Sequence, residues 1–174
     1  MLGGEVAAAE KRVNYLAKLG NFDMKVWGDE GWRAIEQYGV KYMGSAGYIY
    51  EINKIYDASC INIDRNRLYQ TDIVPMRIFD IMACGGFVLV EYSRELDEIF
   101  EIGREIETYR TVDELVSKAD YYLDHRAEAL EIAELDREAV CKNHMISMRV
   151  NHMLNTIPPP FLSTPNGERE RCKT

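Results

Sequence analysis

Two charged residues, Arg77 and Asp80, interrupt the apolar run PMRIFDIMACGGFVLVEY, which spans residues 75–92. A helix is predicted over residues 75–84, and its first turn contains Arg77, whose guanidinium could bind a phosphate in bidentate fashion. Asp80 lies about one turn further along, and its carboxylate suits two adjacent ribose hydroxyls. An alternative stays open, because Arg77 and Asp80 have the i, i+3 spacing of an ordinary ion pair on a solvated helix face.

The start of this helix is itself a predicted anion site. Pro75 suits a first helical turn because its missing N–H group costs nothing there. The backbone N–H groups of Ile73 and Val74, at the end of a polar loop over residues 64–74, then point the same way as the helix dipole. Such an N-terminus attracts phosphate without any special motif.

Short apolar strands alternate with helices along the rest of the chain. This alternation predicts an α/β fold with a Rossmann-like parallel sheet, helices on both faces and C-terminal helices packing alongside. The predicted strands cover residues 24–27, 40–43, 60–63, 86–92 and the surroundings of Ile106. The predicted helices cover residues 5–19, 31–37, 48–57, 75–84, 95–100 and 111–157, the last region with a break near residues 124–125.

Glycines recur where the predicted strands end, at Gly28, at Gly44 and at the pair Gly85 and Gly86. Ligands of parallel α/β sheets bind beyond the carboxyl ends of the strands, so these glycines indicate a possible ligand edge. Glycines at strand ends also serve plain turns, and the sequence does not separate the two roles.

The chain divides into two parts by composition. Residues 1–157 carry the periodic pattern and predict one Rossmann-like domain. Residues 158–174 are rich in Pro, Ser, Gly and charge, which predicts a disordered or loosely docked tail.

Composition limits the partners. The net charge of −8, from 21 basic and 29 acidic residues, argues against nucleic-acid binding, which needs clustered Lys and Arg. No apolar run is long enough to span a membrane, and no signal peptide is visible. The 4 cysteines include no C-x-x-C pair, which favours a reducing, cytoplasmic location. The 3 histidines lack ligand spacing with carboxylates, so no metal site is predicted.

The pattern P-x-R-x-F-D-x-M-A-C-G-G, followed by an apolar strand and the acidic stretch SRELDEIFEIGREIETYRTVDELVSKADYYL, resembles the C-terminal half of GT-B glycosyltransferases. The similarity is closest to the CgeB-like, spore-maturation branch of the group-1 enzymes. It continues through KNHMISMRVNHML and covers roughly residues 10 to 155. The resemblance implies one Rossmann-like half of a GT-B fold.

The resemblance also implies roles for particular residues. In that group, two acids eight positions apart contact the nucleotide-sugar donor, and the matching positions are Asp72 and Asp80. Asp72, the expected catalytic residue, would contact the transferred sugar, and Asp80 would hold the ribose. Both are Asp where the family usually has Glu, so each side chain reaches one methylene less. Arg77 would lie near the donor diphosphate.

Three further positions follow from the same resemblance. Gly28 and Gly44 would open space for the nucleotide, and Tyr48 would stack near the base. The donor is a substrate, a nucleotide-diphosphate sugar, and no cofactor is expected. The leaving group would be stabilised by helix N–H groups and Arg77 rather than by a metal.

The resulting hypothesis is the donor-binding domain of a hexosyltransferase-type glycosyltransferase, acting on an unknown acceptor. A GT-B enzyme has two such domains, so we expect an acceptor-binding domain or subunit as partner, and the sequence leaves open whether this chain is active alone. The alternative is a non-catalytic Rossmann-like binding module that keeps the motif for structure. A flavodoxin-like phosphoacceptor domain is disfavoured, because no predicted strand ends in clustered acids.

Overall fold

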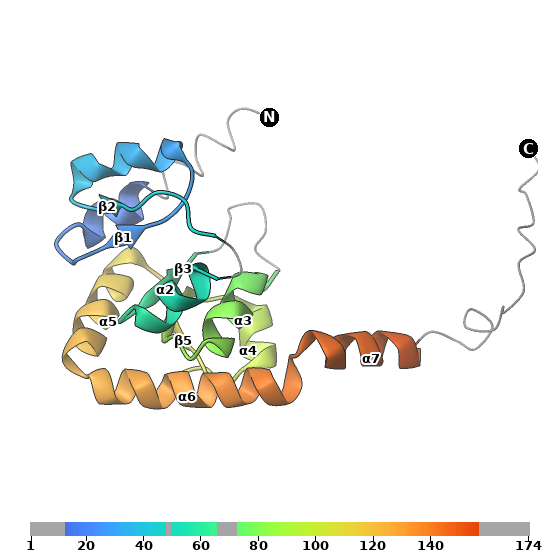
Figure 1. Cartoon of the computed structure of the whole chain (residues 1–174). Coiled ribbons are helices and arrows are strands. Elements are labelled where there is room, and N and C mark those ends of the chain that lie inside the picture. Colours follow the sequence, from blue (N-terminus) through green and yellow to red (C-terminus); the bar gives the residue numbers. More distant parts are fainter. Residues whose placement is uncertain (1–12, 48–49, 66–72, 157–174) are drawn as a thin grey trace, which may run out of the picture.

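The computed structural model describes residues 13–47, 50–65 and 73–156 (Figure 1). Residues 13–19 are helical, and a 3-10 helix, η1, covers Glu30–Tyr38. The strands are β1 (Lys25–Val26), β2 (Lys41–Tyr42), β3 (Asn62–Asp64), β4 (Val88–Glu91) and β5 (Glu107–Tyr109). The α-helices are α2 (Ile52–Ala58), α3 (Met76–Ala83), α4 (Arg94–Ile99), α5 (Val112–Asp124), α6 (Arg126–Asn143) and α7 (Ile146–Thr156).

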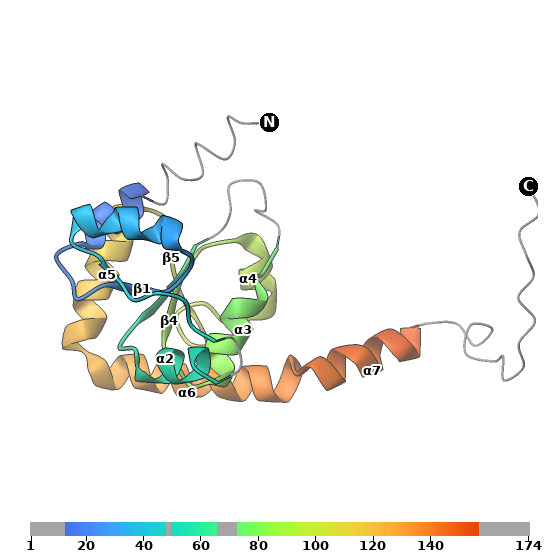
Figure 2. The ribbon, with the colours of Figure 1, turned by 45° about the horizontal axis from the view of Figure 1, so that its top comes forward.

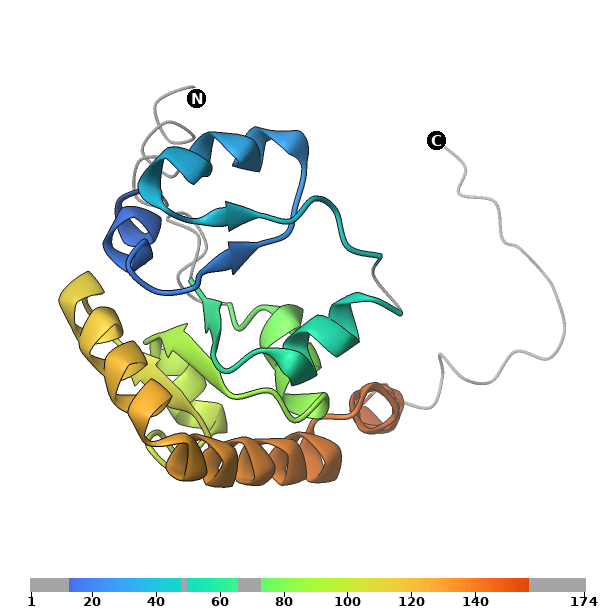
Figure 3. The same cartoon turned by 60° about the vertical axis from the view of Figure 1, so that its left-hand side comes forward.

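All strand pairs are parallel, as the alternation of strands and helices predicts. β3, β4 and β5 form one sheet with β4 in the centre, and β1 pairs with β2 in a second, two-stranded sheet. The predicted α/β fold of Rossmann-like type is therefore confirmed, with the described strands divided between two small sheets. Figure 3 shows the unit of β1, β2 and η1 on one side and the three-stranded sheet with α5 and α6 on the other.

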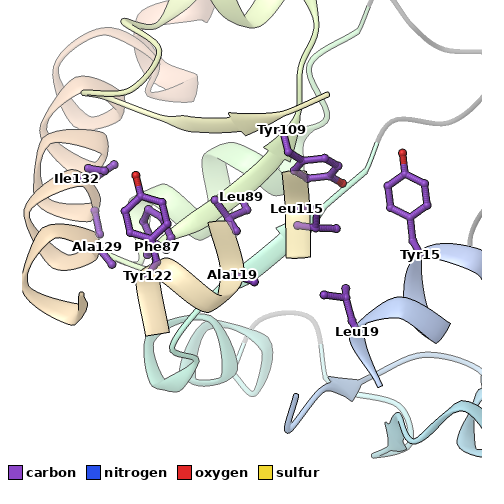
Figure 4. Close-up of a cluster of buried hydrophobic side chains, with 11 residues drawn as sticks. Tyr15, Leu19, Phe87, Leu89, Tyr109, Leu115, Ala119, Tyr122, Ala129 and Ile132 are labelled. Atoms are coloured by element: carbon purple, nitrogen blue, oxygen red, sulfur yellow. The ribbon is translucent and has the colours of Figure 1, made fainter. Parts of the chain in front are cut away.

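The side chains of β4 and its flanking residues alternate between two apolar clusters. Phe87 and Leu89 pack with α5 and with the helix of residues 13–19 (Figure 4). Val88 and Val90 pack with α3 and α4 on the opposite face. Because successive strand residues point to opposite sides, a strand buried on both faces must be apolar throughout, as this one is. The predicted helices on both faces are confirmed.

The Gly85–Gly86 pair lets α3 turn directly into β4. Gly85 has a φ of +77°, in the left-handed region that favours glycine. A Cβ on Gly86 would lie only 2.7 Å from the backbone oxygen of Tyr56 and 2.7 Å from Nδ2 of Asn62. Gly86 therefore allows α2, β3 and the start of β4 to approach more closely than any side chain would permit.

The C-terminal region is helical with the predicted break, since α5 ends at Asp124 and α6 begins at Arg126. α6 contributes buried residues to both clusters, and α7 extends away from the sheet (Figures 1 and 2). Aromatic contacts stabilise the junction between α6 and α7. The ring centroids of His144 and Phe79 are 5.6 Å apart, and Cζ of Arg149 lies 4.5 Å from the centroid of the Phe79 ring.

Within the described ranges, no helix is long and apolar enough to cross a membrane. The predicted tail, residues 158–174, lies outside the described residues. The predicted limits of the domain stay a prediction.

Candidate functional site

Arg77 and Asp64 form an ion pair where β3 leads into α3. Asp64 is the last residue of β3 and is 1% exposed, while Arg77 lies in the first turn of α3. Nε of Arg77 donates to Oδ1 of Asp64 at 2.6 Å, and Nη2 of Arg77 donates to the same oxygen. The open question of whether Arg77 pairs with Asp80 is thereby answered, because its ion pair is made with Asp64 instead.

Hydrogen bonds hold both the backbone and the side chain of Asp64. The Tyr109 hydroxyl donates to the backbone oxygen of Asp64 at 2.9 Å, and the backbone N–H of Arg65 donates to the carboxylate. Oδ2 of Asp64 is buried and accepts no hydrogen bond from the described part of the chain. Burial raises the pKa of Asp64, and the Arg77 guanidinium opposes that rise by stabilising the ionised form.

Asp80 is half-buried on α3, the helix that packs against α2. Burial raises the pKa of Tyr56, on α2, and the negative charges of Asp80 and Asp64 add to the rise while Arg77 opposes it. The hydroxyl of Tyr56 therefore lies within the electrostatic reach of all three charges. Asp80 also adds to the rise in the pKa of Cys84, which burial causes first.

The start of α3 has the features of an anion-binding N-terminus. Pro75 is the N-cap, no described side chain caps the helix, and no acid lies in its first turn. Ile73 is exposed, and Val74 is partly buried against the apolar cluster that contains Val88 and Val90. The positive end of the helix dipole is thus reinforced by Arg77 and opposed by no local carboxylate of the helix itself.

Gly28 and Gly44 lie together at the carboxyl ends of β1 and β2. The N–H of Gly28 donates to the oxygen of Gly44 at 2.9 Å. Gly44 has a φ of +86°, and no described residue beyond its two chain neighbours has an atom within 4 Å of where a Cβ would stand. A Cβ on Gly28 would lie 2.5 Å from Cδ1 of Trp32, so the indole occupies the space in front of this glycine. The two glycines belong to a different sheet from Asp64.

Two predicted site residues, Asp72 and Tyr48, lie outside the described residues. Among the residues that are described, no three His, Cys, Asp or Glu side chains gather as a metal-binding group. The predicted roles of Gly28, Gly44, Ile73, Val74, Arg77 and Asp80 toward a ligand stay predictions.

Asp64 is the site residue that sequence reasoning missed, because residues 64–74 were assigned to a polar loop. The sequence places Asp64 directly after the predicted strand of residues 60–63 but gives no signal for its partner, and the structure supplies the rest. Asn62 and Asp64 share one face of β3 by the two-residue strand period, and both are buried polar residues. A buried acid at a strand end requires a partner, and the basic residue in the next helix supplies it.

A family model described as glycosyl transferase-like matches residues 10–155. The match includes all five strands and the whole of the Arg77–Asp80 region. No curated protein is significantly similar to the chain.

Proposed function

Because the chain belongs to the glycosyl transferase-like family, we propose that it binds the nucleotide-diphosphate sugar donor of a glycosyltransferase. The observation that carries this proposal is the first turn of α3, where a helix N-terminus that no described side chain caps and a half-exposed Arg77 lie together. Asp80 follows within the same helix. Helix N–H groups and guanidinium groups are the usual partners of phosphate oxygens.

In this proposal the donor diphosphate lies against the start of α3. The N–H groups near Ile73 and Val74 and the guanidinium of Arg77 would stabilise the charge that develops on the leaving nucleotide. Since these groups are already cationic or dipolar, the step would proceed without a metal ion. Binding that is unchanged by a chelator is therefore expected.

The remaining roles come from the family resemblance. Asp80 would accept hydrogen bonds from the ribose, Asp72 would contact the transferred sugar, and Tyr48 would stack near the base. Gly28 and Gly44 would leave space for the nucleotide. The finer assignments, a CgeB-like group-1 enzyme of GT-B type and a C-terminal donor domain that works with a separate acceptor-binding domain or subunit, belong to the same proposal.

Calorimetric titration with UDP-, GDP- and ADP-sugars tests the proposal directly. We expect one base to be bound, and we expect Arg77→Gln and Asp80→Asn to weaken that binding. Arg94→Gln and Asp97→Asn are matched controls, because both residues are exposed on α4, and both should leave the affinity unchanged. A folded sample that binds none of the donors at millimolar concentration would contradict the proposal.

A second candidate is a non-catalytic binding module that keeps the motif for structure. The ion pair between Arg77 and buried Asp64 favours it, because that pair gives the motif arginine a structural role. Asp80→Ala separates the two candidates. Loss of donor binding with an unchanged unfolding midpoint supports the donor site, whereas unchanged binding with a lowered midpoint supports the structural module.

A further inference from the structure

The Arg77–Asp64 pair is strongly asymmetric in exposure. The side chain of Asp64 is 0% exposed, whereas the side chain of Arg77 is 54% exposed. The acid is therefore part of the interior, and the cation reaches from it to the surface beside the start of α3.

The contact geometry leaves one side of the guanidinium available. Arg77 uses Nε and Nη2 on a single oxygen, Oδ1 of Asp64, so Nη1 makes no part of this contact. Asp64 is itself held by the β3–β4 pairing, in which it lies opposite Val90, and by the Tyr109 hydroxyl. The contact with Asp64 therefore ties the Arg77 guanidinium to the end of a hydrogen-bonded strand.

We propose that Asp64 is a positioning residue that holds the guanidinium of Arg77 in the orientation in which it binds the donor diphosphate. The inference rests on the proposed function and adds to it a residue of β3 that lies outside the motif P-x-R-x-F-D-x-M-A-C-G-G. Its physical basis is conformational entropy. A free arginine side chain loses rotamer freedom on being fixed, and fixing it before the ligand arrives removes much of that cost from binding.

The charge of Asp64 makes the proposal sharply testable. If Asp64 acted only through its field, its negative charge would repel phosphate, and neutralising it would tighten nucleotide binding. If Asp64 acts by orienting Arg77, the same neutralisation weakens binding. The two mechanisms therefore predict opposite signs for Asp64→Asn, a substitution that keeps the shape of the side chain.

Calorimetric titration with UDP, GDP and ADP measures that sign on the full chain. We expect Asp64→Asn to weaken binding of the preferred nucleotide by roughly tenfold, about the value of one well-oriented charged hydrogen bond. Arg77→Lys keeps the positive charge but loses the paired N–H donors of the planar guanidinium, so it should weaken binding to a similar extent. Adding Asp64→Asn to Arg77→Lys should then have little further effect, because the two substitutions remove one shared interaction.

Arg77→Lys also guards against the case in which Asp64→Asn fails to fold, because the buried residue Asp64 is unchanged in Arg77→Lys. Unchanged or tighter binding by a folded Asp64→Asn variant, when the unsubstituted protein binds, would overturn this inference alone. Failure of the unsubstituted protein to bind any of the three nucleotides would instead contradict the proposed function.

A second measurement does not depend on a ligand. In protein labelled with ¹⁵N-arginine, the Nε–H resonance of Arg77 should be distinct and slow to exchange with solvent. Asp64→Asn should shift it and speed its exchange, while Asp97→Asn, on the exposed surface of α4, should leave it unchanged. An Arg77 resonance that does not respond to Asp64→Asn overturns the positioning role whatever the nucleotides do.

Discussion

Two buried aspartates in this fold have opposite surroundings. Asp64 closes β3 and pairs with Arg77, whereas Asp136 lies in the middle of α6 and is 0% exposed. Neither carboxyl oxygen of Asp136 has a hydrogen-bond partner among the described residues. Burial raises the pKa of Asp136 to about 9, and the negative charge of Glu105 adds to the rise. Burial also raises the pKa of Asp64, but there Arg77 opposes the rise.

The difference shows that a buried carboxyl group does not by itself mark a site. With a pKa of about 9, Asp136 is protonated near neutral pH, and no described residue pairs with it as a counter-charge, so it offers nothing to a ligand at the surface. Asp64 is connected to the surface by the half-exposed side chain of Arg77. The functional argument depends on that connection, and the following substitutions test whether the two acids differ as described.

The largest effect is expected for Asp136→Asn. The folded-state pKa of about 9 lies above the reference value of 3.8, so between these values the native state holds a proton that the unfolded state has lost. The free energy of unfolding therefore falls as pH rises. From pH 5 to pH 8 this contribution is about 4 kcal/mol, at about 1.4 kcal/mol for each pH unit. Asp136→Asn should abolish it.

Urea unfolding at pH 5 and pH 8 measures this prediction. The variant should gain stability over the unsubstituted protein as pH rises. Asp97→Asn is the control, because this exposed aspartate has no burial to relieve. A difference between the variant and the unsubstituted protein that is the same at both pH values would mean that Asp136 is ionised in the native state.

The next largest effect is expected for Arg77→Met. This change leaves the Asp64 carboxylate buried without its cation. Because more than half of the Arg77 side chain faces solvent, we expect a loss of only about 1–3 kcal/mol at pH 8. The loss should shrink as pH falls toward 4, since protonated Asp64 needs no cation. Thermal unfolding of Arg77→Met beside Arg94→Met over that pH range would reveal it, and a loss independent of pH would contradict it.

Asp64→Asn should change stability less than Asp136→Asn does. The same chemical change is made in both, but at Asp64 the cost of burial is opposed by Arg77, so less is relieved when the charge is removed. We expect a change below about 1 kcal/mol between pH 5 and pH 8. An effect as large as that of Asp136→Asn, in paired urea titrations, would show that Arg77 does not compensate the Asp64 charge.

Much of this fold follows from local patterns. The uninterrupted apolar character of residues 87–90 predicts a strand buried on both faces, and the Gly85–Gly86 pair predicts the tight turn before it. Asp136 also carried a local signal, because it falls within the apolar stripe of α6. That stripe consists of Ala129, Ile132, Ala133, Asp136, Ala139 and Val140, at helical spacing.

The ion pair at the candidate site could not be predicted in the same way. Asp64 and Arg77 are 13 positions apart and belong to a strand and a helix, so no single period relates them. Their contact exists because the tertiary structure places the first turn of α3 beside the end of β3. Long-range pairing of this kind is a property of the tertiary structure. Here Arg77 pairs with Asp64 of the strand and not with Asp80, its neighbour on the helix.

The smallest effect tests the cause of the raised pKa at Asp136. Glu105→Gln removes the charge that adds to it, while the amide oxygen can still accept the hydrogen bond that the Glu101 N–H gives to Glu105 at 2.9 Å. The pKa of Asp136 should fall, which stabilises the protein only where Asp136 is ionised, above about pH 9. We expect a few tenths of a kcal/mol there and no change near pH 7. The gain should vanish when Asp136→Asn is also present, because no acid then remains to respond. A gain that persists in the double variant would assign the effect of Glu105 to the loop before β5 rather than to the buried acid of α6.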